Sequence, residues 1–222
     1  MTFLQLCQRL RSETGISGTG PSTVIGQTGD LLRVVQWVSS AYEDIQNARP
    51  DWQFAQTSFS FPTISGTATY TPVAVSITDL LSWKNDDFRV YLAAADETFL
   101  AYLPWDAFRA AYQFGSLRAQ TGKPTVVTTK PNDSIILWPT PDAVYTIDGQ
   151  YYKKARTMTA NADEPVFKSN FHLAIVWRAL MFYGADLGAA EAYAHGEREY
   201  NKIMRKLDFD QLPEITYGAP LA

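Results

Sequence analysis

Helical periodicity marks both ends of this 222-residue chain and is absent from its middle. Apolar residues recur at helical spacing over 30–49 and 171–207, and the roughly 120 residues between these stretches read as short strands broken by turns. Neither end can bury its apolar stripe alone, so the two ends must pack together. The sequence therefore predicts an α+β fold. Its N- and C-terminal helices form one bundle, and its central antiparallel β-rich insertion resembles a sandwich or barrel.

Two helices are expected near the N-terminus. The second, at 30–49, has Asp30 as its N-cap and ends before Pro50. The first spans 2–13 and gathers its apolar side chains on one face: Phe3, Leu6, Cys7 and Leu10.

The connection 14–29 between these helices is rich in glycine and longer than most loops. It leads into a helix N-terminus, where an anion could bind. A phosphate-binding loop also needs a preceding strand and a Lys-Ser/Thr pair after spaced glycines, and both are missing here. The composition favours a mobile loop that orders against a neighbouring molecule.

The C-terminal part carries two more helices. The stretch 164–187 is apolar nearly all round, which places it at the centre of the bundle, and Gly184 to Gly188 ends it. The stretch 189–207 is amphipathic. Residues 208–222 show no period and are expected to form an extended arm.

The middle of the chain alternates between short strands and turns. A hairpin is expected from 58–61 and 68–71, followed by a short helical turn at 77–83 and a short helix near 105–114. Further strands are expected at 88–92, 98–103, 126–128, 135–138 and 145–151.

Three parts follow from this pattern. Residues 1–50 and 164–207 form the helical bundle, residues 51–163 form the β-rich insertion, and residues 208–222 form the arm. No apolar run approaches the length of about 20 residues that a membrane helix needs. The net charge of −4 and the lack of a long basic run argue against tight binding of nucleic acid. The single cysteine, Cys7, fits a small core residue in a chain folded in a reducing cytoplasm.

The sequence holds no convincing catalytic, cofactor or metal site. The only histidines, His172 and His195, match no zinc pattern, and one cysteine cannot build a structural zinc site. No Gly-x-Ser-x-Gly motif is present. A pair of carboxylates could serve a glycosidase, but the candidate pairs read as turn and surface residues. These pairs are Asp86/Asp87, Asp96/Glu97 and Asp208/Asp210.

Basic residues gather in two places. The set at 153–156 ends a strand beside two tyrosines, a pattern that could stack on nucleic-acid bases. The set on the last helix is interspersed with Glu197 and Glu199, which favours a solvated face whose best functional use is a subunit contact.

The order of elements and several local sequences resemble the head-to-tail adaptor (connector) proteins of tailed bacteriophages, across nearly the whole chain. The matching pieces are packing and turn motifs rather than an active-site signature. They are Ala-Arg-Pro-Asp-Trp at 48–52, Ser-Phe-Ser-Phe at 58–61 with Thr-Ala-Thr-Tyr at 67–70, Ile-Ile-Leu-Trp-Pro-Thr-Pro at 135–141 leading to Tyr-Tyr-Lys-Lys at 151–154, and Gly-Glu-Arg-Glu-Tyr at 196–200.

This resemblance implies a non-enzymatic structural protein of the virion, located at the head–tail interface and synthesised in the host cytoplasm. Copies are expected to form a ring, a dodecamer, that docks to the portal protein on one side and to a tail or nozzle protein on the other. Double-stranded DNA passes through the ring without specific binding, and an acidic lumen would let it slide.

A ring requires two different complementary faces on each subunit. We expect these faces to come from the 14–29 loop, the surface of the last helix and the arm, where Ile215 and Tyr217 could anchor in a groove. The candidate interface residues are Gly18, Gly20, Arg198, Lys202, Arg205, Ile215 and Tyr217.

Two other functions stay open. One is another phage structural protein, such as a neck, tail-completion or receptor-contacting component, for which the β-rich middle is equally suited. The other is a carboxylate-dependent cell-wall hydrolase, which predicts a cleft with one strongly desolvated carboxyl group.

Overall fold

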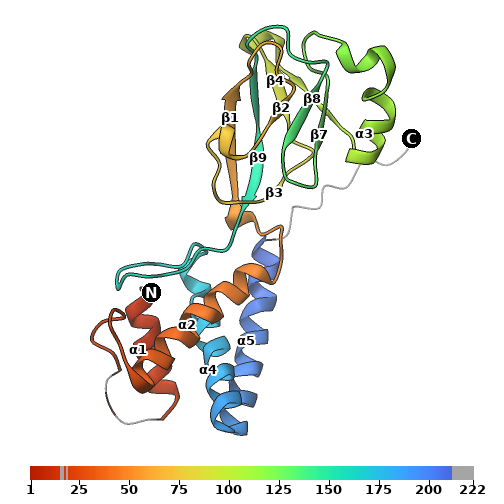
Figure 1. Ribbon diagram of the computed structural model, residues 1–222. Helices are drawn as coiled ribbons and strands as arrows, with labels where there is room; N and C mark the ends of the chain where they lie inside the picture. The colour runs from red at the N-terminus through yellow and green to blue at the C-terminus, as the bar shows by residue number, and fades with distance from the viewer. Residues whose placement is uncertain (16–17, 19, 212–222) are drawn as a thin grey trace. The chain divides into compact units, whose positions relative to one another are not determined.

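The computed structural model describes residues 1–15, 18 and 20–211, and they fall into two compact units. The helical unit combines Met1–Phe54 with the chain from Ala155 onward, and the β unit is Ala55–Lys154. Helices lie at both ends of the chain and a mostly antiparallel β region lies in its middle, so the predicted α+β fold is confirmed (Figure 1).

The helical unit is built around α4 (Leu173–Leu187). This helix packs against the other three of the unit: α1 (Phe3–Glu13), α2 (Gly29–Asn47) and α5 (Ala190–Gln211). Its central position follows from its composition, because α4 buries side chains on nearly every side. On α1 the predicted apolar face is the buried one, Cys7 included.

Several helix ends differ from the predicted ones. Thr28, not Asp30, is the N-cap of α2, and Asp30 lies in the first turn, where its charge favours the helix dipole. α5 continues to Gln211, so the first four residues of the expected arm are helical. The remainder of the arm, with Ile215 and Tyr217, lies outside the described residues.

Two glycines set the spacing between α4 and α5. Gly184 was expected to break the helix, but it lies inside α4, where a Cβ atom would come within 2.7 Å of the Tyr193 backbone nitrogen. A Cβ at Gly196 would lie 2.8 Å from the Trp177 carbonyl oxygen. The helix ends instead at Gly188, whose left-handed conformation forms the C-cap. Gly184 and Gly196 let the backbones of α4 and α5 approach more closely than any residue with a Cβ atom would permit.

The predicted helix at 164–187 begins nine residues late. Of residues 164–172, only Ser169–Phe171 form a helical turn, a 3₁₀ one, and the chain that precedes this stretch is bonded to the first two helices. The Phe3 N–H donates to the Asp163 carbonyl at 2.7 Å, and Gln46 Nε2 donates to the Arg156 carbonyl at 2.9 Å. Tertiary hydrogen bonds thus fix the approach to α4, and local periodicity does not predict such bonds.

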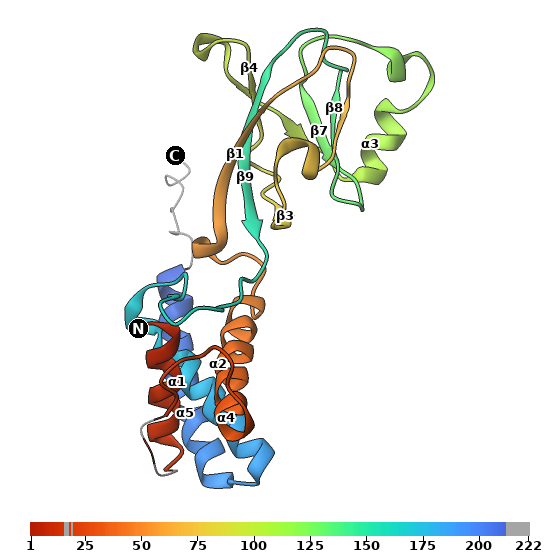
Figure 2. The same cartoon turned by 60° about the vertical axis from the view of Figure 1, so that its left-hand side comes forward.

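The β unit contains two sheets (Figures 1 and 2). Its strands are antiparallel except for one parallel pair, β6 with β7. The first sheet has the order β1-β9-β4-β5, with β3 also paired to β9: β1 (Gln56–Pro62), β9 (Thr146–Lys153), β4 (Arg89–Tyr91), β5 (Thr98–Phe99) and β3 (Leu80–Trp83). The second has the order β2-β8-β7-β6: β2 (Thr69–Tyr70), β8 (Ile135–Trp138), β7 (Val126–Thr129) and β6 (Ala101–Tyr102).

An aromatic cluster forms the core of the β unit. Phe59 meets four other rings, those of Phe61, Trp83, Phe88 and Tyr151, and Phe61 also lies against Tyr70. Aliphatic side chains of both sheets complete the core. Both sheets thus turn an apolar face to the same interior, as in a sandwich.

Two predictions in this unit are wrong. The strands at 58–61 and 68–71 do not form a hairpin, since β1 pairs with β9 far along the chain and β2 pairs with β8. The region 77–83 is not helical, because a 3₁₀ turn occupies Val73–Val75 and strand β3 follows. Alternation identifies a strand and its buried face, but it does not identify the partner strand.

The short helix expected near 105–114 is present as α3 (Trp105–Tyr112). Its Phe108 is buried against Val126 and Ile136 of the second sheet. A 3₁₀ helix, Gly115–Ala119, follows it directly and was not expected.

Candidate interaction surfaces

The outward face of α5 carries the three predicted basic residues of this helix. Arg198, Lys202 and Arg205 line one open hollow of about 500 Å³, so the structure brings them together. Ala194 and Phe209 extend the row at both ends, and all five side chains are exposed. At about 100° per residue the five positions fall within an arc of about 80°. We call this row the α5 stripe.

The α5 stripe is cationic along its length and aromatic at its end. Arg198 bonds to His195 at 2.8 Å, and Lys202 lies 3.4 Å from Glu199, which partly neutralises the middle of the row. Arg205 forms no ion pair with any described residue. Phe209 is 79% exposed, which is unusual for so large an apolar side chain. The stripe therefore presents both charge and apolar area to a partner.

A second hollow, of about 610 Å³, opens between α2 and α4. Trp37 and Phe182 give it aromatic walls, and an ion pair between Arg33 and Asp186 crosses its rim. Arg33 also lies over the Trp37 ring at 5.2 Å, a cation–π contact. We call this feature the α2/α4 groove. The Trp37 ring is only partly buried.

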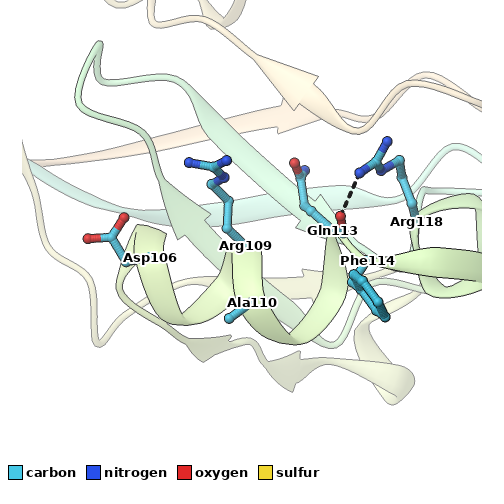
Figure 3. A pocket seen from close by; sticks show the side chains of 6 residues that line it. All are labelled: Asp106, Arg109, Ala110, Gln113, Phe114 and Arg118. Atoms are coloured by element: carbon cyan, nitrogen blue, oxygen red, sulfur yellow. Dashed lines mark hydrogen bonds between the residues drawn. The ribbon is translucent and has the colours of Figure 1, made fainter.

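A third surface lies on the β unit beside α3. Figure 3 shows its hollow, of about 460 Å³, with Arg109 and Arg118 on either side of Gln113. The Arg118 guanidinium donates to the Gln113 carbonyl at 2.7 Å and so holds the connection after α3 in place. Phe114 is 75% exposed at one end of this hollow. It belongs to no periodic pattern, so sequence analysis did not single it out.

The two glycines of the interface prediction have different surroundings. Gly18 is exposed, and a Cβ atom there would meet nothing within 4 Å. Gly20 packs on α1, because a Cβ would lie 3.2 Å from the Gln8 Cα atom. Farther along the same loop, the Val24 N–H donates to Asn161 Oδ1 at 2.7 Å, and Val24 is buried. The described end of the loop is thus attached to its own unit.

Packing within the helical unit accounts for the positions of the two histidines and the cysteine. The His195 ring makes a T-shaped contact with the Trp177 ring, with centroids 5.2 Å apart. His172 is buried, and desolvation lowers its pKa. Burial raises the pKa of the Cys7 thiol to about 12, which makes it unreactive. Among the described residues no group of His, Cys, Asp and Glu side chains could hold a metal ion.

The described carboxyl groups do not show the environment that a hydrolase needs. A general acid requires a pKa raised by desolvation. Three described carboxyl groups have clearly shifted pKa values, and all three are lowered. Backbone hydrogen bonds lower the pKa of Asp96 and Asp163, and the Lys168 ammonium lowers that of Asp210. In the described part of the chain, no helix is long and apolar enough to cross a membrane.

Comparison with models of protein families gives a match over the whole chain. The family model described as SU10 adaptor protein matches residues 1–222 of the chain. No curated protein matches it.

Proposed function

The chain belongs to the SU10 adaptor protein family of bacteriophages, and we propose that it forms the ring that joins the portal to the tail. The family match over the whole chain carries this proposal. In it, copies assemble as a dodecamer at the head–tail interface and enclose part of the channel through which DNA passes.

The surfaces of the helical unit support a ring. A cyclic assembly with one kind of contact needs two different faces on each subunit, pointing in different directions. On α5 the stripe lies opposite Gly196, the residue that faces α4. On α4 the groove residues Phe182 and Asp186 lie about 160–200° from Gly184, which faces α5. The stripe and the groove therefore open on separate sides of the α4/α5 pair.

The two faces also match in chemistry. The stripe ends in an exposed aromatic ring, Phe209, and the groove offers the rings of Trp37 and Phe182. Aromatic residues in pockets commonly supply much of the binding energy at protein interfaces. We assign the contact between neighbouring copies to these faces. The exposed Phe114 and the hollow beside α3 then remain for a tail or nozzle protein.

DNA passage requires a surface that does not hold phosphates. The chain has a net charge of −4, and in this arrangement the α5 stripe is covered by the neighbouring copy. The DNA would then meet a ring with an acidic excess, which favours sliding over binding.

Mass photometry of the purified chain, alone and mixed with the portal ring of the same genome, tests the proposal. A discrete complex with about one copy per portal subunit is expected. Recovery of the chain with tail components, with no portal association at any salt concentration or ratio, would instead identify another neck or tail protein.

A matched pair of variants tests the assigned face. Arg205→Ala removes a cation from the stripe, and Lys206→Ala removes an exposed cation one position along the same helix but off the stripe. Arg205→Ala is expected to weaken ring assembly and reduce its salt dependence, while Lys206→Ala leaves both unchanged. Equal effects of the two variants would mean that only the overall charge matters.

A further inference from the structure

Strand β1 forms an open edge of the first sheet. The strand order begins with β1, and β9 is its only partner among the described strands (Figure 2). The pairing with β9 extends over seven consecutive residues, Gln56–Pro62. The far side of β1 therefore leaves a row of backbone groups to which no described strand bonds.

The hydrogen bonds around this pair identify the groups that point outward. The Thr63 N–H donates to the Tyr145 carbonyl at 2.7 Å, one step beyond the end of the ladder. Because bonded and non-bonded pairs alternate in an antiparallel ladder, Phe61 and Phe59 bond to β9. The same alternation turns the N–H and C=O groups of Ser60 and Ser58 away from it.

A hydrogen bond on the other side of β9 independently supports the outward direction of the Ser58 backbone groups. Ser58 pairs with Gln150, and the Gln150 carbonyl accepts from the Lys84 N–H at 3.0 Å. That carbonyl points away from β1, so the Ser58–Gln150 pair is a non-bonded one. Ser58 and Ser60 thus offer two donors and two acceptors at the edge.

This edge lacks the features that usually prevent strand addition. Natural edge strands carry charges, bulges or prolines, or are very short. β1 has no charged residue, its register with β9 is unbroken, and its only proline, Pro62, is its last residue. A strand so long and regular is suited to pairing with another segment.

A ring joins neighbouring copies through two different faces, and the sheet supplies no second edge that matches β1. Its other described edges are β5, which has two residues, Thr98 and Phe99, and β3, whose register with β9 shifts between Leu80 and Ser82. The Leu100 N–H donates to the Phe88 carbonyl, so by the same alternation only Phe99 turns its backbone groups outward. Neither this single residue nor the short, irregular β3 can continue a seven-residue edge.

We propose that β1 receives an extended segment of another virion protein as an additional strand. This inference rests on the proposed function, because it requires the chain to be built into a virion. The incoming segment alternates polar and apolar residues. Polar side chains lie beside the exposed Ser58 and Ser60, and apolar side chains lie beside Phe59 and Phe61, extending the apolar face of the sheet.

Amide hydrogen exchange at single-residue resolution tests the proposal. The isolated chain is compared with the same chain in particles purified from infected cells. In the isolated chain, Ser58 and Ser60 exchange fast, and Phe59 and Phe61 exchange slowly. In the particle, exchange at Ser58 and Ser60 is expected to slow by on the order of 100-fold. Unchanged fast exchange of both serines in the particle overturns the proposal.

A proline variant tests the same edge through function. Ser60→Pro removes an outward N–H that the ladder with β9 does not use, a position where an edge strand tolerates proline. Ser60→Thr keeps the N–H and is the control. We expect Ser60→Pro to reduce incorporation of its strand partner into particles at least tenfold, and Ser60→Thr to have no effect. Circular dichroism of both variants verifies folding, and the exchange measurement decides the question if Ser60→Pro fails to fold.

Other occupants give distinct results, each of which overturns the proposal. Protection of both serines in the isolated chain that is lost in a chain ending at Gln211 would identify the chain's own C-terminal residues. Protection in a complex of this chain alone, without other virion proteins, would identify a second copy. Absence of the chain from particles would refute the proposed function as well, whereas a normal portal complex with unprotected serines refutes only this inference.

Discussion

The helical unit and the β unit differ in what their backbones leave available. A helix bonds its own N–H and C=O groups, so the helical unit can recognise a partner only through side chains such as those of the α5 stripe and the α2/α4 groove. A sheet bonds its backbone to neighbouring strands, so an edge such as β1 keeps free groups. Contacts of the helical unit therefore depend on the charge and shape of side chains, whereas contacts at the β1 edge depend mainly on main-chain hydrogen bonds.

The cores of the two units also differ, in the side chains that give them close packing. The helical unit gains close packing from small residues, because Gly184 and Gly196 bring α4 and α5 together. The β unit gains close packing from large rings, with Phe59 meeting four aromatic neighbours. Added volume at the α4/α5 contact should therefore harm the helical unit, and loss of a buried ring should harm the unit that contains it. The predictions that follow test this contrast.

Large truncations in each core have the largest expected effect. Trp177→Ala in the helical unit and Phe88→Ala in the β unit should each cost about 3–5 kcal/mol of unfolding free energy, since both rings are buried. Urea unfolding followed by helical circular dichroism and by amide exchange in β9 separates the units. Each variant should shift the transition of its own unit. A single shared shift would show that the units unfold together, and an unchanged transition would place that ring at the surface.

Adding one methyl group to the helical core should come next. Gly196→Ala places its Cβ 2.8 Å from the Trp177 backbone oxygen, so α4 and α5 must move apart, at a cost of about 1–3 kcal/mol. Asn201→Ala, on the exposed side of α5, is the control and should change stability by less than about 0.5 kcal/mol. Unchanged thermal stability of Gly196→Ala would mean that the helices can separate freely.

The sequence was informative where structure is local. The apolar face of α1, the position of α3 and most strands followed from periodicity, because a helix or strand repeats its own pattern. Sequence analysis failed where a contact with a residue far along the chain determines the structure. The pairing of β1 with β9, the irregular approach to α4 and the role of Gly184 inside a helix all depend on contacts made across the fold.

The interaction surfaces divide in the same way. Arg198, Lys202 and Arg205 could be predicted because a single helix places them on one face. The α2/α4 groove could not, because Trp37 and Phe182 come from helices that only the fold brings together. Ile215 and Tyr217, predicted from composition, lie outside the described residues and stay a prediction.

A single hydroxyl group in the β unit should have a smaller effect than either core change. Tyr70 Oη accepts from the Ile64 N–H at 2.9 Å and donates to the Thr67 carbonyl at 2.8 Å, closing the connection between β1 and β2. Tyr70→Phe should cost about 1–2 kcal/mol, because it leaves these backbone groups without their partner. Tyr91→Phe is the control, since its hydroxyl bonds to no described residue. Equal thermal midpoints for the two variants would contradict this role.

The smallest expected effect is a dependence on acid in the turn before β5. Asp96 accepts hydrogen bonds from the Ala93 and Leu92 N–H groups and lies 3.0 Å from Lys123 Nζ. The Ala93 bond above all, and then Lys123, lower the pKa of Asp96 from 3.8 to about 2. Because the folded pKa lies below the unfolded one, this stabilisation is complete above about pH 4 and is lost as the pH falls through about 2.

An NMR titration of the Asp96 carboxyl should give a midpoint near pH 2, and Lys123→Ala should raise it. A midpoint at the ordinary value of 3.8 would show that the turn does not hold the carboxylate. The loss of stability should be small, because this turn is solvent-exposed and screened.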